Sequence, residues 1–211
     1  MTVLAAAVER FGPWLFLVAS GAEIAAWFRL SRRTMLIVAI AVAVIGLVPV
    51  AGLSLTDLVY SVTGPLGAGS LVILAIGLAA RLQTGLTGDR RFGLLALAVL
   101  QIVIFVPVYA FELSAAGPDV YRWGYAAWEL PAGGVVLLLF AWWAEAPAIA
   151  LWLGLAGLLY LADAYASRNF LDYAGDPVAL LLAAVMLVRS GLPARRRRYV
   201  PMSAKTRTTS S

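Results

Sequence analysis

The sequence predicts an all-α, polytopic integral membrane protein with seven transmembrane helices. Three observations support this fold class. The chain is 63% hydrophobic and only 13% charged, whereas an average soluble domain is nearer half apolar and about a quarter charged. Its apolar residues fall into seven long segments. Its basic residues gather between these segments in the alternating pattern that orients membrane proteins.

A transmembrane helix needs about 20 mostly apolar residues, and seven segments reach or approach this length. They are residues 11–28, 34–53, 65–82, 92–113, 124–143, 146–165 and 177–192. Pro65 and Pro177 begin the third and seventh segments, as proline favours the first helical position. Asp176 is the expected N-cap of the seventh helix. We expect residues 1–193 to form one seven-helix transmembrane domain.

The distribution of basic residues predicts the topology. With seven spans, thirteen of them fall on one side: Arg29, Arg32, Arg33, Arg81, Arg90, Arg91, Arg189, Arg195, Arg196, Arg197, Arg198, Lys205 and Arg207. Only Arg10, Arg122 and Arg168 fall on the other side. Because cytoplasmic loops carry the excess of lysine and arginine, the N-terminus should be outside and the C-terminus cytoplasmic. The expected location is the plasma (inner) membrane.

Residues 194–211 are basic and rich in serine and threonine, which predicts a disordered cytoplasmic tail. Its run Arg195, Arg196, Arg197 and Arg198 is a candidate site for anionic lipid headgroups. Since the arginines lie beside apolar segments, the net charge of +5 reflects topology, and we expect no nucleic-acid partner. The expected partners are the lipid bilayer, a small-molecule or ion ligand, and a second copy of the chain.

The first three and last three segments match in hydropathy when shifted by 112 residues, which places Pro65 on Pro177. The spacing indicates a 3+1+3 arrangement of two parallel repeats joined by the fourth helix. Such repeats occur in membrane transporters, with substrate sites between them. The layout resembles that of the sugar transporters called SWEETs, and prolines in the first, second, fifth and sixth segments add to the likeness. They are Pro13, Pro49, Pro131 and Pro147. The Pro-Gln motif of that family does not occur, so the resemblance implies a fold and no substrate.

The chain contains no cysteine and no histidine. This excludes disulfides, thiol chemistry, haem ligation by these residues and histidine-ligated zinc. No nucleophile motif or phosphate-binding loop is present. We therefore predict no catalytic residues, no metal site and no cofactor. Chemistry that depends on protons or ions would have to use carboxylates, tyrosines, arginines or the backbone.

The stretch from Tyr160 to Pro177 is the longest polar and aromatic run between two apolar segments, and we expect it at the external mouth of the bundle. Carboxylates at similar depth in the neighbouring helices favour a ligand-binding cavity there, because charges inside a membrane usually face the bundle interior. The predicted ligand-binding residues are Glu112, Glu129, Asp163, Tyr109 and Tyr160. The alternative is that these carboxylates pair structurally with Arg122 and Arg168.

Three functions fit this pattern. The first is a transporter or channel-like protein whose acidic, tyrosine-lined external cavity takes a cation or a small polar solute. The second is a non-catalytic membrane subunit or scaffold that binds partner helices. The third is a membrane-embedded enzyme that uses paired carboxylates on a lipid.

Overall fold

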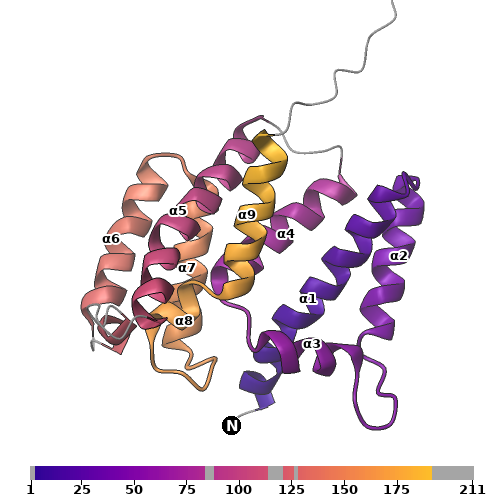
Figure 1. Ribbon diagram of the computed structural model, residues 1–211, viewed down its shortest axis with the longest axis horizontal. Coiled ribbons are helices and arrows are strands. Elements are labelled where there is room, and N and C mark those ends of the chain that lie inside the picture. The colour runs from indigo at the N-terminus through magenta and orange to yellow at the C-terminus, as the bar shows by residue number, and fades with distance from the viewer. Residues whose placement is uncertain (1–2, 84–87, 114–120, 126–127, 192–211) are drawn as a thin grey trace, which may run out of the picture.

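The computed structural model describes residues 3–83, 88–113, 121–125 and 128–191 of the chain, and this part is all-α. A single isolated bridge joins Val50 and Leu53. The elements are α1 (Val3–Trp27), α2 (Arg32–Ile45), α3 (Leu55–Thr63), α4 (Ala68–Leu82), α5 (Gly88–Leu113), the 3₁₀ helix η1 (Tyr121–Tyr125), α6 (Glu129–Trp143), α7 (Pro147–Leu161), α8 (Phe170–Ala174) and α9 (Pro177–Gly191). The all-α prediction is thus confirmed for the described residues (Figure 1).

The seven predicted segments correspond to α1, α2, α4, α5, α6, α7 and α9. The short elements α3, η1 and α8 connect them, and α3 and α8 lie at the end of the molecule where the chain begins (Figure 1). Within the described residues, α5 is the one helix both long and apolar enough to cross a membrane, over Arg91–Phe111. Four shorter apolar helices cover Ala68–Leu82, Glu129–Trp143, Pro147–Leu161 and Pro177–Ser190.

Three of the predicted helices are shorter than expected, and each has a local cause. α2 ends at Ile45, because Gly46 forms the C-cap and Pro49 follows. α6 begins at Glu129, so that Pro131 lies in its first turn, where a missing N–H costs no helical hydrogen bond. α7 ends at Leu161, and Asp163 takes a φ of +47° in the turn that follows.

The core lies where α4, α5, α7 and α8 meet. Val72, Leu97, Phe105 and Trp152 are almost fully buried there. The indole N–H of Trp152 donates to the carbonyl of Ala174 and so fixes α8 against α7. α1 packs on α2 and α4, and α9 packs on α5, so α4 and α5 form the centre of the bundle.

The order long helix, long helix, short helix, long helix occurs twice, in α1–α4 and in α6–α9. The packing partners differ between the two sets. The pairs α1–α2 and α6–α7 are equivalent, and both pack closely. α4 also packs on α1, whereas the equivalent helix α9 packs mainly on α5. The helix order therefore agrees with a 3+1+3 arrangement, while a true structural repeat stays a prediction.

Candidate ligand cavity at the α3 and α8 end

A cavity of about 290 Å³ opens at the end of the bundle formed by α3 and α8. Three carboxylates and three tyrosines contribute to its wall, and we call it the acidic cavity. Its lining residues are Glu9, Tyr60, Thr63, Pro65, Tyr109, Tyr165, Ala166, Ser167, Asp172, Gly175, Asp176 and Pro177. No basic side chain is among these described lining residues. The cavity therefore presents negative charge and phenol groups to whatever enters it.

Asp176 is the deepest carboxylate of the acidic cavity, with only 6% of its surface exposed. It accepts hydrogen bonds from Gly67 N at 2.7 Å, from the Ser70 hydroxyl at 2.8 Å and from Ala179 N at 2.9 Å. The last of these confirms the predicted N-cap of α9. Burial raises the pKa of Asp176, and the hydrogen bonds that it accepts oppose this effect. The carboxylate thus ties the N-termini of α4 and α9 together.

Asp172 lies in α8 and is half-buried. It accepts a hydrogen bond of 2.6 Å from the Tyr121 hydroxyl and another from the Ser167 hydroxyl. Burial, followed by the hydrogen bond to Asp172, raises the pKa of Tyr121, so this phenol stays protonated at neutral pH. These contacts hold Asp172 at the rim of the acidic cavity.

Glu9 comes from α1 and is 7% exposed. The Tyr60 hydroxyl of α3 donates to its Oε2 at 3.2 Å. Burial is the main cause that raises the pKa of Tyr60, and the neighbouring Glu9 adds to it. The adjacent Arg10 forms an ion pair with Asp57 at 3.3 Å. Glu9 therefore lines the acidic cavity, and no ion pair joins it to an arginine of the described residues.

Tyr165 completes the wall from the loop between α7 and α8. Its hydroxyl donates to the carbonyl of Leu66 at 2.6 Å, and its ring stacks on Tyr173 with centroids 4.8 Å apart. Burial and then the charge of Asp176 raise the pKa of Tyr165. Tyr173 is fully buried and donates to the carbonyl of Ser167 at 2.8 Å. Tyr165 and Tyr173 thus fix the loop between α7 and α8 in place.

The structure brings one of the five predicted site residues into the acidic cavity, and that residue is Tyr109. Tyr160 packs behind the wall, edge-on to Phe170 and Tyr173 with centroid distances of 5.4 Å. Glu129 and Asp163 are exposed and line neither of the two cavities that we describe. The side chain of Glu112 lies outside the described residues.

The displacement of Glu129 and Asp163 follows from the helix ends. We expected both inside transmembrane helices, but Glu129 is the first residue of α6 and Asp163 follows the end of α7. The residues that sequence reasoning missed are Glu9, Asp172 and Asp176. Two of these three belong to the polar stretch 160–177, so the density of polar and aromatic residues in that stretch was the better signal.

Below the acidic cavity lies a thin layer that contains polar groups. Ser70, bonded to Asp176, is fully buried, and so is Gln101 of α5. Gln101 packs against Gly69, where an added Cβ would lie 2.7 to 2.8 Å from its amide atoms. Within the described residues, neither amide atom of Gln101 has a hydrogen-bond partner. Buried amides are nearly always paired, so this one is an exception that needs a functional or structural reason.

A second cavity begins on the other side of this layer, at Ile73 and Leu74. These residues follow Ser70 by three and four positions along α4, a rise of about 4.5 to 6 Å. The linings of the two cavities come within five residues of each other along α9, at Pro177 and Leu182, a rise of about 7.5 Å. Among the described residues, no group of three or more Asp and Glu side chains is close enough to hold a metal ion.

Searches against protein-family models, curated proteins and solved structures found no match for this chain.

Proposed function

We propose that this chain is a multi-pass membrane protein that binds a cation, or a small polar solute with positive charge, in the acidic cavity and moves it across the bilayer. The observation that carries the proposal is the lining of that cavity: Glu9, Asp172 and Asp176 all line it, and no basic side chain is among the described lining residues. Carboxylates inside a membrane protein mark ion and substrate pathways.

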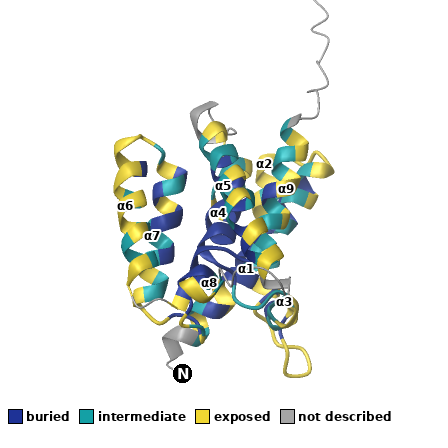
Figure 2. Cartoon of the chain, turned by 60° about the vertical axis from the view of Figure 1, so that its left-hand side comes forward, coloured by how far each residue is buried: buried dark blue, intermediate teal, exposed yellow. Residues whose placement is uncertain are grey.

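The surface of the helices supports membrane placement. On α6, Val136 is 65% exposed, Leu139 64% and Trp143 78%, and most of this helix is exposed in Figure 2. α2 likewise exposes Ile37 and Ile40. Soluble monomers rarely expose apolar patches of this extent, whereas lipid would cover them. α4, α6, α7 and α9, with 15 residues each, are about 22 Å long. Short spans of this kind are accommodated by a thinner bilayer and by interfacial side chains.

The layer below the acidic cavity supports transport rather than binding alone. A polar side chain without a partner at this depth is costly, at about 1–3 kcal/mol. A passing ion or polar solute would supply the partner that Gln101 lacks. A movement of α4 against α5 and α9 that opens this layer would connect the two sides.

A non-catalytic membrane subunit is the second candidate function. The exposed apolar faces of α2 and α6 favour it, since partner helices could cover them as well as lipid. The two functions differ in the acidic cavity. A subunit has no use for three carboxylates there, and neutralising them should leave its partner binding unchanged.

The test is ion flux into proteoliposomes that contain the purified chain, with Na⁺, K⁺ and H⁺ as the probes. We expect flux of at least one probe, and we expect Glu9→Gln and Asp172→Asn to lower its rate at least about tenfold, because each removes a negative charge from the wall of the acidic cavity. Glu145→Gln is the matched control, since Glu145 is exposed in the turn between α6 and α7.

Glu129→Gln separates the acidic cavity from the site predicted by sequence alone. If it abolishes flux while Glu9→Gln and Asp172→Asn do not, the binding residues are the exposed ones. If no probe crosses the vesicles and none raises the melting temperature of the protein, the transport proposal is wrong.

A further inference from the structure

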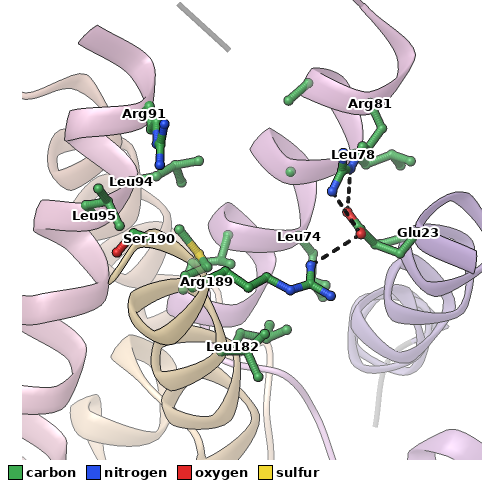
Figure 3. A pocket seen from close by; sticks show the side chains of 16 residues that line it. Glu23, Leu74, Leu78, Arg81, Arg91, Leu94, Leu95, Leu182, Arg189 and Ser190 are labelled. Carbon is green, nitrogen blue, oxygen red and sulfur yellow. Dashed lines mark hydrogen bonds and ion pairs between the residues drawn. The ribbon is translucent and has the colours of Figure 1, made fainter. Parts of the chain in front are cut away.

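The second cavity lies at the opposite end of the bundle, among α1, α4, α5 and α9 (Figure 3). Its volume of about 520 Å³ falls within the range of small-molecule sites, roughly 300–1,000 Å³. We call it the arginine cavity, after the three arginines among its lining residues. They are Arg81, Arg91 and Arg189.

Most of the wall of the arginine cavity is formed by apolar side chains. Ile73, Leu74 and Leu78 of α4 line one side, and Leu94 of α5 and Met186 of α9 line others. Apolar side chains offer water no hydrogen bonds. An apolar chain of matching length would cover these side chains and remove their surface from water. Gly77 also lines the cavity, and a Cβ added there would have nothing within 4 Å. The space beside α4 is therefore open.

The charged groups of the arginine cavity are unequal in number. Glu23 accepts from Arg81 Nε at 2.7 Å and Arg81 Nη2 at 3.0 Å, and it pairs with Arg189 Nη1 at 3.5 Å (Figure 3). The partners of Glu23 come from α4 and α9. Three arginines against one glutamate leave two positive charges in excess.

Of the three arginines that line the cavity, Arg91 is the one without an ion pair to another described residue. Across the described residues, no hydrogen bond or ion pair joins it to another side chain, and it lies on the α5 wall, opposite the α4 wall that carries Arg81 (Figure 3). An arginine guanidinium binds phosphate or carboxylate through two parallel hydrogen bonds. The cavity thus combines an apolar body with an anion-binding group at its mouth.

We propose that the arginine cavity binds an anionic phospholipid, with one acyl chain in the apolar body and the phosphate held by Arg91 and Arg189. The inference rests on the membrane placement proposed above, and it does not depend on ion transport. Net-negative lipids are enriched in the leaflet that the positive-inside pattern assigns to this end of the bundle. The two excess positive charges match a head of net negative charge better than a zwitterionic one.

The walls leave an entrance for such a lipid. α1 and α9, which form two sides of the arginine cavity, make no more than marginal backbone contact with one another. The Arg189–Glu23 ion pair crosses the space between them (Figure 3). Since both groups are more than a third exposed, this pair contributes little to stability and can exchange its partner for a phosphate.

The test compares the binding of dioleoyl phosphatidylglycerol and dioleoyl phosphatidylcholine to the purified protein in detergent, by native mass spectrometry or competition with a fluorescent lipid. We expect the wild type to prefer the anionic lipid at least tenfold. Arg91→Gln should abolish this preference. Arg33→Gln is the matched control, because Arg33 is exposed in the first turn of α2 and does not line the cavity.

Gly77→Leu tests the acyl position independently of charge. The added side chain enters open space, so the protein should fold, but it should occupy the apolar body and weaken binding of both lipids at least tenfold. Gly157→Leu is its control, since Gly157 also has nothing within 4 Å and lies in α7 outside the cavity.

Equal binding of the two lipids by the wild type would overturn the proposal, and so would a preference that Arg91→Gln and Arg33→Gln retain alike. Because binding is measured in detergent, this result is separate from ion flux. A protein that binds the anionic lipid but moves no ion would refute the transport proposal alone.

Discussion

At the scale of single residues, the buried amide of Gln101 lowers the stability of the folded state, because it has no hydrogen-bond partner among the described residues. Gln101 is fully buried, its amide has no partner among the described residues, and Gly69 leaves the room in which it sits. A leucine has nearly the same size and no polar atoms. Replacing an unpaired buried polar group with an apolar one of similar shape removes a desolvation penalty of about 1–3 kcal/mol.

We therefore predict that Gln101→Leu raises the stability of the protein and lowers its ion flux. Thermal unfolding in detergent and proteoliposome flux measure the two effects on the same preparation. If Gln101 is retained for function, the substitution should raise stability and lower flux. A variant that is less stable than the wild type would mean that Gln101 has a structural partner, and a stable variant with unchanged flux would remove Gln101 from the path.

At the scale of helices, the sequence predicted which segments are helical but not where three of them end. The predicted segments included residues 46–53 and 162–165, because apolar residues continue beyond the last helical turn. The ends are set by Gly46, by Pro131 and by the left-handed turn at Asp163, which hydropathy does not register. The carboxylates at positions 129 and 163 were assigned by depth, so an error of one turn moved them to the surface.

The loops between helices were the least predictable part of the site. Glu9 lines the acidic cavity because α1 begins as early as Val3, and Asp172 lines it because α8 packs against α7. Such placements depend on tertiary packing, which has no periodic signal in a single sequence. The capping role of Asp176 was predictable, because an aspartate before a proline at a helix start has a local cause.

The capping of α4 and α9 by Asp176 leads to a prediction about pH. Because burial raises the pKa of Asp176, the folded state binds a proton more tightly than the unfolded state, whose aspartate titrates near pH 3.9. Stability should therefore fall as pH rises from about 4 toward the raised pKa, and stay level above it. Asp176→Asn keeps an N-cap acceptor and removes this titration.

The measurement is the melting temperature of both proteins in detergent at several pH values between 4 and 8. The advantage of Asp176→Asn over the wild type should grow as pH rises above 4. The pKa of Asp57, which hydrogen bonds from Ser54 lower, acts in the opposite direction but equally in both proteins. A difference that does not change with pH would show that Asp176 keeps one protonation state throughout.

At the scale of the whole molecule, the two ends carry opposite charge. The acidic cavity gathers Glu9, Asp172 and Asp176 beside α3 and α8, while the arginine cavity lies at the end where α4 and α9 finish. Arg32 donates to the carbonyl of Leu82, so the α1–α2 turn joins the same basic end. In the membrane placement proposed above, this separation would put the arginine-rich end on the cytoplasmic side.

The orientation can be tested with reporter fusions that are active on only one side of the membrane. Fusions after Arg33 and Gly88 should report a cytoplasmic location, because they end in the first residues of α2 and α5, at the arginine-rich end of the bundle. A fusion after Ser167 should report an external location, because it ends in the wall of the acidic cavity. The proposed arrangement requires that α1, α2, α4, α5, α6 and α7 each cross the bilayer, although α5 is the one helix in the described part of the chain that is long and apolar enough by itself. If the fusions after Gly88 and Ser167 reported the same side, the helices between them would not span as proposed. The acidic cavity would then not open to the outside.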